Sequence, residues 1–379
     1  MEPGKKPNPI AMFFWKNKRQ RAKNIYFLVM LLVVTFSLGI GYVSKKLNTI
    51  TYDSEVNKPS INSADDLYDE EEFELMQSID SAGSLNDYLY KWANNGGQLY
   101  SSKNVINVLL VGLDSDDALQ NGGRSDSLIL VSLNKKTRKI NLTSFFRDTW
   151  TYMNIGGQDR YGKINSSYMY GGDEALLETL EKDFKIDIDY YVAVDFSSFT
   201  DIINALGGLT VEVEEYEAAY INRTTIHNID YGPAVKLNGW EALVYARIRK
   251  SDSDSDVSRT RRQRKVITAL INSAKGASFN QLNNALDTLF QYVKTDLSKM
   301  QILSFAAQAL ANGWMNYDFQ ETTISDSDVF RTGYVGDSSV VFIDFELAAH
   351  RIQNAIYGDT NITLDDSRVI PFNLVSRLD

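Results

Sequence analysis

The spacing of hydrophobic and polar residues becomes regular from Asn104 onward and predicts β-strands. Val105–Leu113 (VINVLLVGL) is a nearly continuous apolar run rich in β-branched residues, which is typical of a buried strand. Ser127–Leu133 and Lys139–Phe145 follow as a second and a third strand. Only the polar stretch 134–138 (NKKTR) separates these two, as in a hairpin. The sequence therefore predicts a three-stranded meander.

Further along the chain, helical and strand patterns alternate. The expected helices are Leu176–Phe184, Phe199–Leu206, Arg259–Ala274, Phe279–Val293, Ser298–Leu310 and Leu347–Ile356. The expected strands are Tyr190–Val194, Leu209–Val213, Glu321–Ile324 and Val340–Phe345. Strands mixed with helices of this length favour an α/β fold in which one sheet is covered on both faces.

A membrane anchor is expected near the N-terminus. Ile25–Val43 (IYFLVMLLVVTFSLGIGYV) contains no charge, and about 20 such residues span a bilayer. The cations that precede it keep the N-terminus in the cytoplasm and place the rest of the chain outside; they are Lys16, Lys18, Arg19, Arg21 and Lys23. A cleaved signal peptide is the alternative, but no small-x-small pattern follows Val43 and the apolar stretch exceeds a usual signal core.

These observations divide the chain into five parts. We expect a basic cytoplasmic segment at 1–24, a single membrane anchor at 25–43, an extracellular stalk at 44–103, a folded domain at 104–358 and a tail at 359–379. The stalk assignment rests on the acidic stretch Asp65–Glu74, which favours a solvated spacer. One amphipathic helix is expected within it, at Ser84–Ala93.

Composition disfavours several kinds of site. The chain has no cysteine, so a disulfide, a thiolate nucleophile and a Cys-ligated zinc are excluded. His227 and His350 are its two histidines and lie far apart in sequence, which argues against a Ser-His-Asp triad or a His-rich metal site. The short segment before the anchor carries no helix-turn-helix pattern, so nucleic acid is not an expected partner.

Positive charge gathers in one region of an acidic chain. There are 39 Lys plus Arg against 49 Asp plus Glu, and the first 24 residues hold 7 of the cations and one anion, Glu2. The remainder is 39 − 7 = 32 positive against 49 − 1 = 48 negative, or −16. Residues 247–265 nevertheless contain 8 Lys or Arg and 3 Asp. Cations that repel one another are best explained by a bound anion, and the planar fork of arginine suits phosphate.

Helical geometry sorts these cations by face. At 100° per residue one face carries Arg259, Arg262 and Gln263, followed by Val266 and Leu270. The opposite face, expected in solvent, carries Arg261, Arg264 and Lys265. Arg247 and Arg249 share one face if their segment is extended. The alternative is ordinary surface salt bridges with Asp252, Asp254 and Asp256.

The meander brings a second group of charges together. Asp114 ends the first strand, Arg124 and Asp126 begin the second, and Arg147 and Asp148 follow the third. Because strand direction alternates, all of them reach the same edge of the sheet. Asp114 and Asp126 could there hold a hard cation such as Mg²⁺ through oxygen ligands. Ordinary turn residues are the alternative, since Asp is common in loops.

The order of these motifs resembles the LytR-CpsA-Psr family from about Asn104 to Gly358. The resemblance is carried by NVLLVGLD at 107–114, RSDS at 124–127, SFFRDT at 144–149, KIN at 163–165, DF at 195–196, LGG at 206–208, LNG at 237–239, ARIR at 246–249 and DVSRTRRQ at 256–263. The chain departs from the family at Phe146, where Pro is frequent, and at Asp116, where Arg is common.

The resemblance implies a three-layer αβα domain with a mixed parallel and antiparallel sheet. It also implies transfer of a phosphoglycan, such as teichoic acid or capsule, from a polyprenyl-pyrophosphate carrier onto peptidoglycan at the surface of a Gram-positive type of bacterium. In that family the positions of Asp114 and Asp126 would hold Mg²⁺ or Mn²⁺. The pyrophosphate would be bound by Arg124, Arg147, Arg247, Arg249, Arg259 and Gln263, to which helix geometry adds Arg262.

Catalysis is accordingly expected from Asp114, Asp126, Arg147, Asp148 and Arg259, with Asp148 or a metal-bound oxygen as the base. Candidates to line a pocket for the polyprenyl chain are Phe196, Phe199, Ile203, Val211, Leu243 and Val266, for which plain core packing is the alternative.

Three other functions remain open at this point. A hydrolase would use the same residues with water as the acceptor. A non-catalytic regulator would bind the lipid carrier and signal inward. A structural wall-binding module would not need an arginine pocket beside paired acids.

Overall fold

The computed structural model describes residues 51–52, 83–95, 97–116, 118–249, 255–276, 293–322, 324–365 and 367–375. All of them lie in the compact unit Ile50–Asp379, which is separate from Met1–Thr49. The expected anchor Ile25–Val43, the acidic stretch Asp65–Glu74 and all but the last residue of the expected helix Phe279–Val293 lie outside the described residues. Within the described ranges, no helix is both long enough and apolar enough to cross a bilayer.

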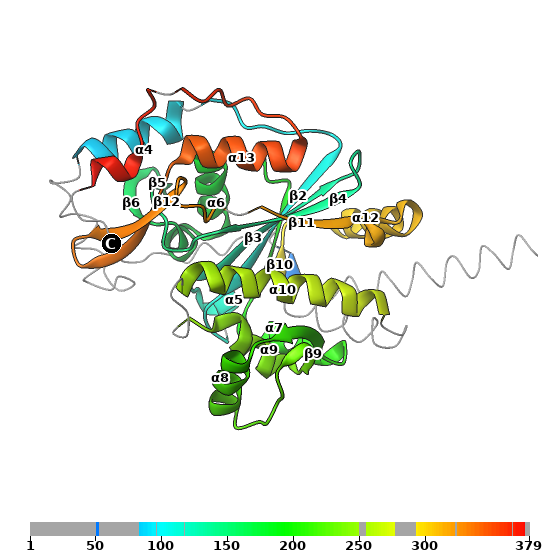
Figure 1. Cartoon of the computed structure of the whole chain (residues 1–379). Helices are drawn as coiled ribbons and strands as arrows, with labels where there is room; N and C mark the ends of the chain where they lie inside the picture. Colours follow the sequence, from blue (N-terminus) through cyan, green and yellow to red (C-terminus); the bar gives the residue numbers. More distant parts are fainter. Residues whose placement is uncertain are drawn as a thin grey trace, which may run out of the picture. The chain divides into compact units, whose positions relative to one another are not determined.

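A mixed seven-stranded sheet forms the centre of this unit (Figure 1). Its strand order is β1 (Thr51–Tyr52), β10 (Lys294–Thr295), β7 (Tyr190–Val194), β2 (Val105–Leu113), β3 (Ser125–Asn134), β4 (Lys139–Phe145) and β11 (Asp318–Thr322). β2, β3 and β4 are antiparallel neighbours, which confirms the predicted meander. β7 runs parallel to β2, and β11 runs parallel to β4, so the expected mixed sheet is also confirmed.

Three two-stranded sheets lie outside this central sheet. They are β5 (Trp150–Ile155) with β6 (Gln158–Lys163), β8 (Leu209–Val213) with β9 (Gly232–Leu237), and β12 (Phe330–Val335) with β13 (Ser338–Ile343). The expected strands Leu209–Val213 and Val340–Phe345 therefore exist but do not join one common sheet, which corrects the single-sheet prediction. Each pairs with a strand whose sequence is largely polar or glycine-containing, so the hydrophobic pattern did not show its partner.

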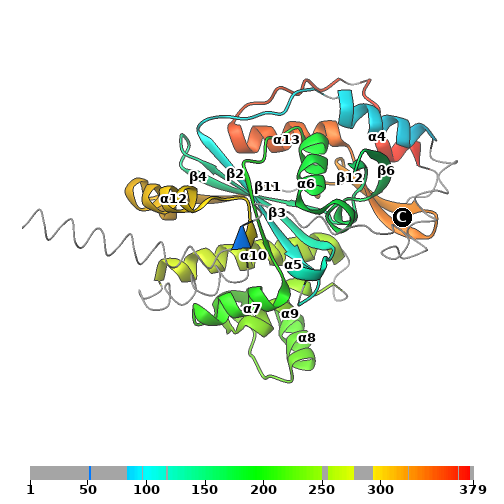
Figure 2. The same cartoon turned by 180° about the vertical axis from the view of Figure 1, so that it is seen from behind.

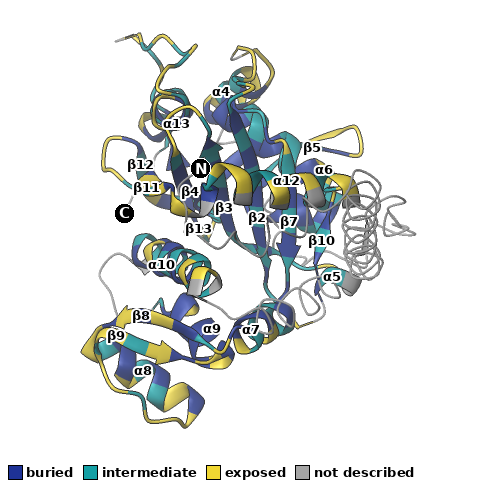
Figure 3. Cartoon of the chain, turned by 90° about the vertical axis from the view of Figure 1, so that its right-hand side faces the viewer, coloured by how far each residue is buried: buried dark blue, intermediate teal, exposed yellow. Residues whose placement is uncertain are grey.

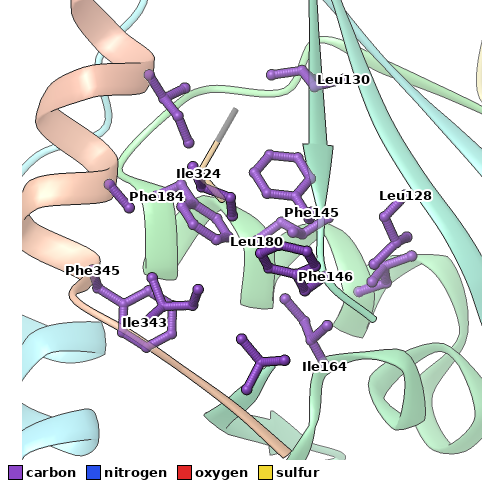
Figure 4. Packing of buried hydrophobic residues seen from close by; sticks show 14 of the residues in the cluster. Leu128, Leu130, Phe145, Phe146, Ile164, Leu180, Phe184, Ile324, Ile343 and Phe345 are labelled. Atoms are coloured by element: carbon purple, nitrogen blue, oxygen red, sulfur yellow. The ribbon is translucent and has the colours of Figure 1, made fainter. Parts of the chain in front are cut away.

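Helices cover both faces of the central sheet (Figures 1 and 2). One face packs against α6 (Ile164–Phe184) and α13 (Phe345–Tyr357), and α4 (Gly83–Asn95) packs in turn on α6 and β5. The other face packs against α10 (Ser255–Gly276) and α12 (Lys299–Asn312). Alternate residues of β2 divide between the two layers: Leu109 belongs to the first cluster, and Leu110 packs against the second. Figure 4 shows the first cluster, in which the rings of Phe145 and Phe184 lie 4.5 Å apart.

A smaller layer lies beyond α10, away from the sheet (Figures 1 and 3). It contains α7 (Phe196–Ala205), β8, α8 (Glu215–Thr225), β9 and α9 (Gly239–Arg247), packed around its own apolar cluster. α7 and α9 approach closely, because a Cβ at Gly239 would lie 2.2 Å from the Thr200 carbonyl oxygen. Val266 of α10 joins the same cluster. α10 is therefore packed on two sides, by the sheet and by this layer.

The folded unit extends beyond the expected domain bounds of 104–358. Leu85, Leu89 and Ala93 of α4 belong to the main apolar cluster, although residues 44–103 were expected as a stalk. Phe372, in the short 3₁₀ helix η4 (Pro371–Leu374) of the expected tail, belongs to it as well. Burial of these side chains makes residues 83–100 and 367–375 integral parts of the domain.

Candidate functional site

The predicted sheet edge is built around a β-bulge. Leu113 pairs with Ser125 and Gly112 with Ser127, so Asp126 is an extra residue on β3. Bulges redirect side chains and are frequent beside active sites. Asp114 directly follows β2, and its Oδ1 accepts a hydrogen bond from the Arg124 backbone N–H at 2.9 Å. Asp114, Arg124 and Asp126 are thus brought together across the loop that carries α5 (Ala118–Asn121).

The turn after β4 is fixed through its backbone. The Thr149 amide and hydroxyl both donate to the Phe146 carbonyl, at 3.1 and 2.7 Å. The Arg147 carbonyl accepts from the Asn165 amide at 3.1 Å, and the Asp148 carbonyl accepts from the Val341 amide at 2.9 Å. Bonds within the turn and bonds from two other elements, α6 and β13, therefore hold the Arg147-Asp148 pair in one orientation, as a preorganised site requires.

Asp148 is surrounded by cations. Its Oδ2 lies 3.3 Å from Arg147 Nε and 3.6 Å from Arg249 Nη2, and its Oδ1 lies 3.3 Å from Lys163 Nζ. Arg147 also forms an ion pair with Asp126. Burial raises the pKa of Asp148, but Arg147, Lys163 and Arg259 outweigh it and hold that pKa below its ordinary value. Asp148 is therefore ionised at neutral pH and acts as an acceptor.

The start of α10 joins the same group. Asp256 Oδ1 lies 3.1 Å from Arg249 Nη2 and 3.4 Å from Arg259 Nη2. The alternative of a salt bridge with Asp256 thus holds for both arginines, within a shared cluster. We call Arg147, Lys163, Arg249 and Arg259 the cationic cluster. Lys163 was part of a quoted motif but was not assigned to the site, because nothing in its sequence context indicated that it reaches Asp148.

Arg259 is the least satisfied member of the cationic cluster. Its side chain is 4% exposed, and among the described residues its Nε has no hydrogen-bond partner. Burial, helped by the charges of Arg147 and Arg249, lowers its pKa to about 10 against the opposing effect of Asp256 and Asp126. A buried cation under this repulsion is stabilised by an added anion. The arrangement is one that an anion would stabilise.

Arg247 and Arg249 have different surroundings. α9 ends at Arg247, so the two residues are extended only across Ile248. Arg247 is exposed, and its guanidinium lies 4.3 Å from the centre of the Phe196 ring. The Phe196 amide donates to the Ser115 carbonyl at 3.2 Å, which ties this ring to the loop after Asp114. Arg247 therefore lies beside the same edge without an ion pair to the carboxylates that hold Arg249.

Arg262 occupies a different environment from the one expected. Its Nε donates to Glu217 Oε1 at 2.6 Å, its Nη1 to the Ile248 carbonyl at 3.0 Å and its Nη2 to the Tyr216 hydroxyl at 2.8 Å. Both ionic partners are almost completely buried. Its placement supports a role in joining α10 to α8 and not in binding pyrophosphate. Gln263, the next residue, is half-buried.

The expectation that Arg264 faces solvent is wrong. Its side chain is 5% exposed, its Nε donates to Glu321 Oε2 at 2.8 Å, and its Nη1 donates to Ser144 Oγ at 3.0 Å. The reason is that both flanks of α10 are covered, so opposite helix faces are buried. Lys265 pairs with the exposed Glu212 at 2.8 Å, and Arg261 is exposed as expected.

The candidates for a lipid pocket fall mostly in the smaller layer. Ile203, Val211 and Val266 belong to one buried cluster, against which Phe199 packs. Leu243 is buried on α9. Phe196 lies half-buried beneath Arg247, between this layer and the charged edge. The apolar candidates thus lie on the same side of the sheet as α10, which also carries Arg259.

The residues at the edge fit a divalent cation only if further ligands are supplied. Among the residues that the structure describes, no group of three or more Asp, Glu, His or Cys side chains could hold a metal. Asp114 and Asp126 offer two carboxylates beside the cationic cluster. Mg²⁺ is commonly bound by one or two carboxylates together with substrate phosphates and water. The donor set therefore fits a site that a bound phosphate would complete.

Known proteins that are similar to this chain are named as teichoic acid transferases. The polyisoprenyl-teichoic acid–peptidoglycan teichoic acid transferase TagU of Oceanobacillus iheyensis is 39% identical over 217 residues, which are 54% of this chain and 64% of that protein. TagU of Bacillus licheniformis is 37% identical over 198 residues, 51% of this chain and 60% of that protein. The chain thus matches less than two thirds of the length of these relatives.

Solved structures share the fold. One described as TagT bound to LIIa-WTA is 27% identical, with a TM-score of 0.54 over 69% of this chain and 98% of that chain. A LytR-CPS2A-psr family protein, YwtF (TagT), with bound octaprenyl pyrophosphate lipid is 23% identical, with a TM-score of 0.51 over 69% of this chain and 93% of that chain; this likeness is one of fold. The family model LytR_cpsA_psr matches residues 53–354, and the chain belongs to that family.

Proposed function

We propose that this chain is a membrane-anchored phosphotransferase that moves a phosphoglycan from a polyprenyl-pyrophosphate carrier onto peptidoglycan. One observation carries the proposal: the buried Arg259, with an unpartnered Nε among the described residues, stands with three other cations around Asp126, Asp148 and Asp256. A diphosphate is the chemical group that such a cluster would stabilise. The names of the TagU relatives agree with this chemistry.

The chemistry suits a site made of arginines and carboxylates. In phosphoryl transfer the protein mainly positions groups and stabilises negative charge spread over phosphate oxygens. In the proposed reaction a sugar hydroxyl of peptidoglycan attacks the phosphorus next to the glycan. A new P–O bond forms, and the bond to the bridging oxygen breaks. Polyprenyl phosphate leaves with that electron pair, and the cationic cluster stabilises its charge.

Asp148 is the candidate to receive the proton of the attacking hydroxyl. Its low pKa makes it a weak base, but a loose transition state needs little proton removal before attack. We further propose that Asp114 and Asp126 hold Mg²⁺ or Mn²⁺ with the phosphate. The bound cation would neutralise diphosphate charge.

The lipid tail is proposed to enter the apolar smaller layer next to α10. Each buried CH₂ contributes roughly 0.8 kcal/mol, so a polyprenyl chain gains from Ile203, Val211 and Val266 as lining. We also propose that Ile25–Val43 anchors the chain with its N-terminus in the cytoplasm. Such an anchor would keep the catalytic domain near the leaflet that holds the carrier.

The direct test supplies the purified full chain, in detergent, with a synthetic polyprenyl-pyrophosphate sugar, peptidoglycan oligomers and Mg²⁺. Mass spectrometry should then detect sugar phosphate joined to peptidoglycan and free polyprenyl phosphate. Release of sugar phosphate without the joined product would identify a hydrolase. Lipid binding without either product, at carrier and acceptor concentrations that saturate binding, would favour the non-catalytic regulator and end the transferase proposal.

A further inference from the structure

The carboxylates of the site already have cationic partners in this structure. Asp126 is paired with Arg147, Asp148 contacts Arg147, Lys163 and Arg249, and Asp256 holds Arg249 and Arg259. The cationic cluster contributes four positive charges, and these three carboxylates contribute three negative charges. A cation and a diphosphate therefore do not enter an uncharged cavity. They must exchange with ion pairs that exist before they arrive.

The Asp126–Arg147 pair stands between the two proposed ligands. Asp126 is a proposed carboxylate ligand of the divalent cation, and Arg147 is a proposed contact of the diphosphate. A guanidinium is not deprotonated in proteins, so Arg147 keeps its positive charge while it is held by Asp126 and Asp148. In a partly buried site the Coulomb energy of such a pair is several-fold larger than in bulk water.

From this pair we propose an exchange, which rests on the proposed function: Arg147 is the resident counter-ion of Asp126 and competes there with the divalent cation. A cation that binds alone either displaces Arg147 or lies beside a fixed guanidinium, and both cost free energy. A diphosphate that binds alone meets the unscreened carboxylate of Asp126. When both bind, the cation takes Asp126 and the diphosphate takes Arg147, so each ligand tightens the other by the same factor.

The chain offers a matched control for this inference. Arg249 belongs to the same cationic cluster, but its described ion pairs are with Asp148 and Asp256. Its side chain is 40% exposed, so a neutral replacement is readily accommodated. Arg249→Gln removes one positive charge from the cluster, as Arg147→Gln does, but leaves the Asp126–Arg147 pair in place. The two variants thereby distinguish an effect of lost positive charge in general from an effect of freeing Asp126 in particular.

The experiment measures Mn²⁺ binding to the full chain in detergent by electron paramagnetic resonance, without any phosphate ligand. Competition at Asp126 predicts that Arg147→Gln lowers the Kd for Mn²⁺ by about tenfold, within the usual range of coupling between two ligands. Arg249→Gln should change it by about twofold or less, as expected for a screened neighbouring charge. Adding Asp126→Asn to Arg147→Gln should remove the gain.

Each other result decides against the exchange. Equal tightening in Arg147→Gln and Arg249→Gln would show general electrostatics, and unchanged or weaker binding in Arg147→Gln would show that Arg147 does not compete. Mn²⁺ binding to none of the proteins would overturn both the exchange and the metal assignment. The transferase proposal is judged separately, by the joined product in the transfer assay, which can be repeated with a chelator to ask whether a metal is needed.

Discussion

Two arginines on α10, Arg259 and Arg262, differ sharply in their surroundings although they lie three positions apart and both side chains are nearly inaccessible to solvent. Arg262 donates from all three nitrogens, to Glu217, the Ile248 carbonyl and the Tyr216 hydroxyl. Arg259 has one carboxylate neighbour at 3.4 Å, and its Nε has no hydrogen-bond partner among the described residues. Burial alone therefore does not distinguish a binding arginine from a structural one.

What separates the two regions is whether the protein itself satisfies the charge. Around Arg262 a buried carboxylate neutralises the guanidinium, and hydrogen bonds account for its donors, which is how a folded protein accommodates a buried ion. Around Arg259 neighbouring cations add repulsion that Asp256 only partly offsets. A site that binds an anion has such uncompensated positive charge before the anion arrives. Substitution of the residues in the two regions should therefore have different effects.

The largest expected effect is a loss of protein stability when the structural Arg262 is replaced. Arg262→Met leaves Glu217 buried without its cation, so the free energy of unfolding should fall by about 3–5 kcal/mol. Urea denaturation followed by circular dichroism measures it. Glu217→Gln in the same protein should restore part of the loss, because it removes the unpaired charge while keeping an acceptor for the Glu214 amide. A loss below about 1 kcal/mol in the single variant would contradict this interpretation.

The next effect is on activity without a loss of stability. Arg259→Met should reduce the rate of glycan transfer by about 10²–10³-fold, or roughly 3–4 kcal/mol of barrier, as for removal of one charge-stabilising donor. A pKa lowered to about 10 means that the native state disfavours the charged form, so at neutral pH the charge costs stability. The free energy of unfolding should therefore stay level or rise.

Arg261→Met, an exposed change on the same helix, is the control for both measurements. If Arg259→Met destabilised the protein as strongly as Arg262→Met does, the contrast between the two regions would be lost. If it transferred glycan at the native rate, Arg259 would not belong to the site.

The smallest effect concerns a buried acid that is not part of the cationic cluster. Asp183 is buried and accepts from the Thr151 hydroxyl at 2.8 Å, and burial raises its pKa to about 8. The folded state thus retains a proton that the unfolded chain releases near pH 4. The free energy of unfolding should therefore fall as pH rises from about 4 to about 8. Between pH 5 and 7 the slope should approach about 1.4 kcal/mol per pH unit.

Asp183→Asn should flatten this slope. Glu178→Gln, on the exposed side of the same helix, should leave it unchanged and is the control. Burial lowers the pKa of Lys185 to about 8, so this residue loses its charge in the folded state only above that pH. It therefore affects the pH dependence of stability above pH 8 and not between pH 5 and 7. Urea unfolding at each pH measures the slope, and a wild-type curve that is flat from pH 5 to 7 would contradict the protonated state of Asp183.

The sequence was sufficient to predict how the charged edge assembles. A meander places the end of one strand beside the start of the next, so Asp114, Asp126 and Arg147 had to meet once the three strands were recognised. The prediction of an anion site rested on the density of cations in an acidic chain. Neither argument needed contacts between distant segments.

What the sequence could not show depends on such contacts. A helical wheel assumes one buried face, and Arg264 was misplaced because α10 is covered on two sides. Lys163 reaches Asp148 only because the hairpin of β5 and β6 returns the chain to the edge, and β6 has few strand-like residues. The buried bonding of Arg262 likewise depends on Glu217, 45 residues away.

The docking of α4 has a practical consequence for anyone who shortens this protein. Lys185 donates from its ammonium to the carbonyls of Trp92 and Ala93, in the last turn of α4, and the Trp92 indole donates to the Asp183 carbonyl. A version that starts at residue 104 would leave the Lys185 ammonium without these acceptors and would expose the apolar side chains of the main cluster against which α4 packs. A version that keeps Ile50 onward also preserves the edge strand β1, and it is the form in which assays and crystals are best attempted.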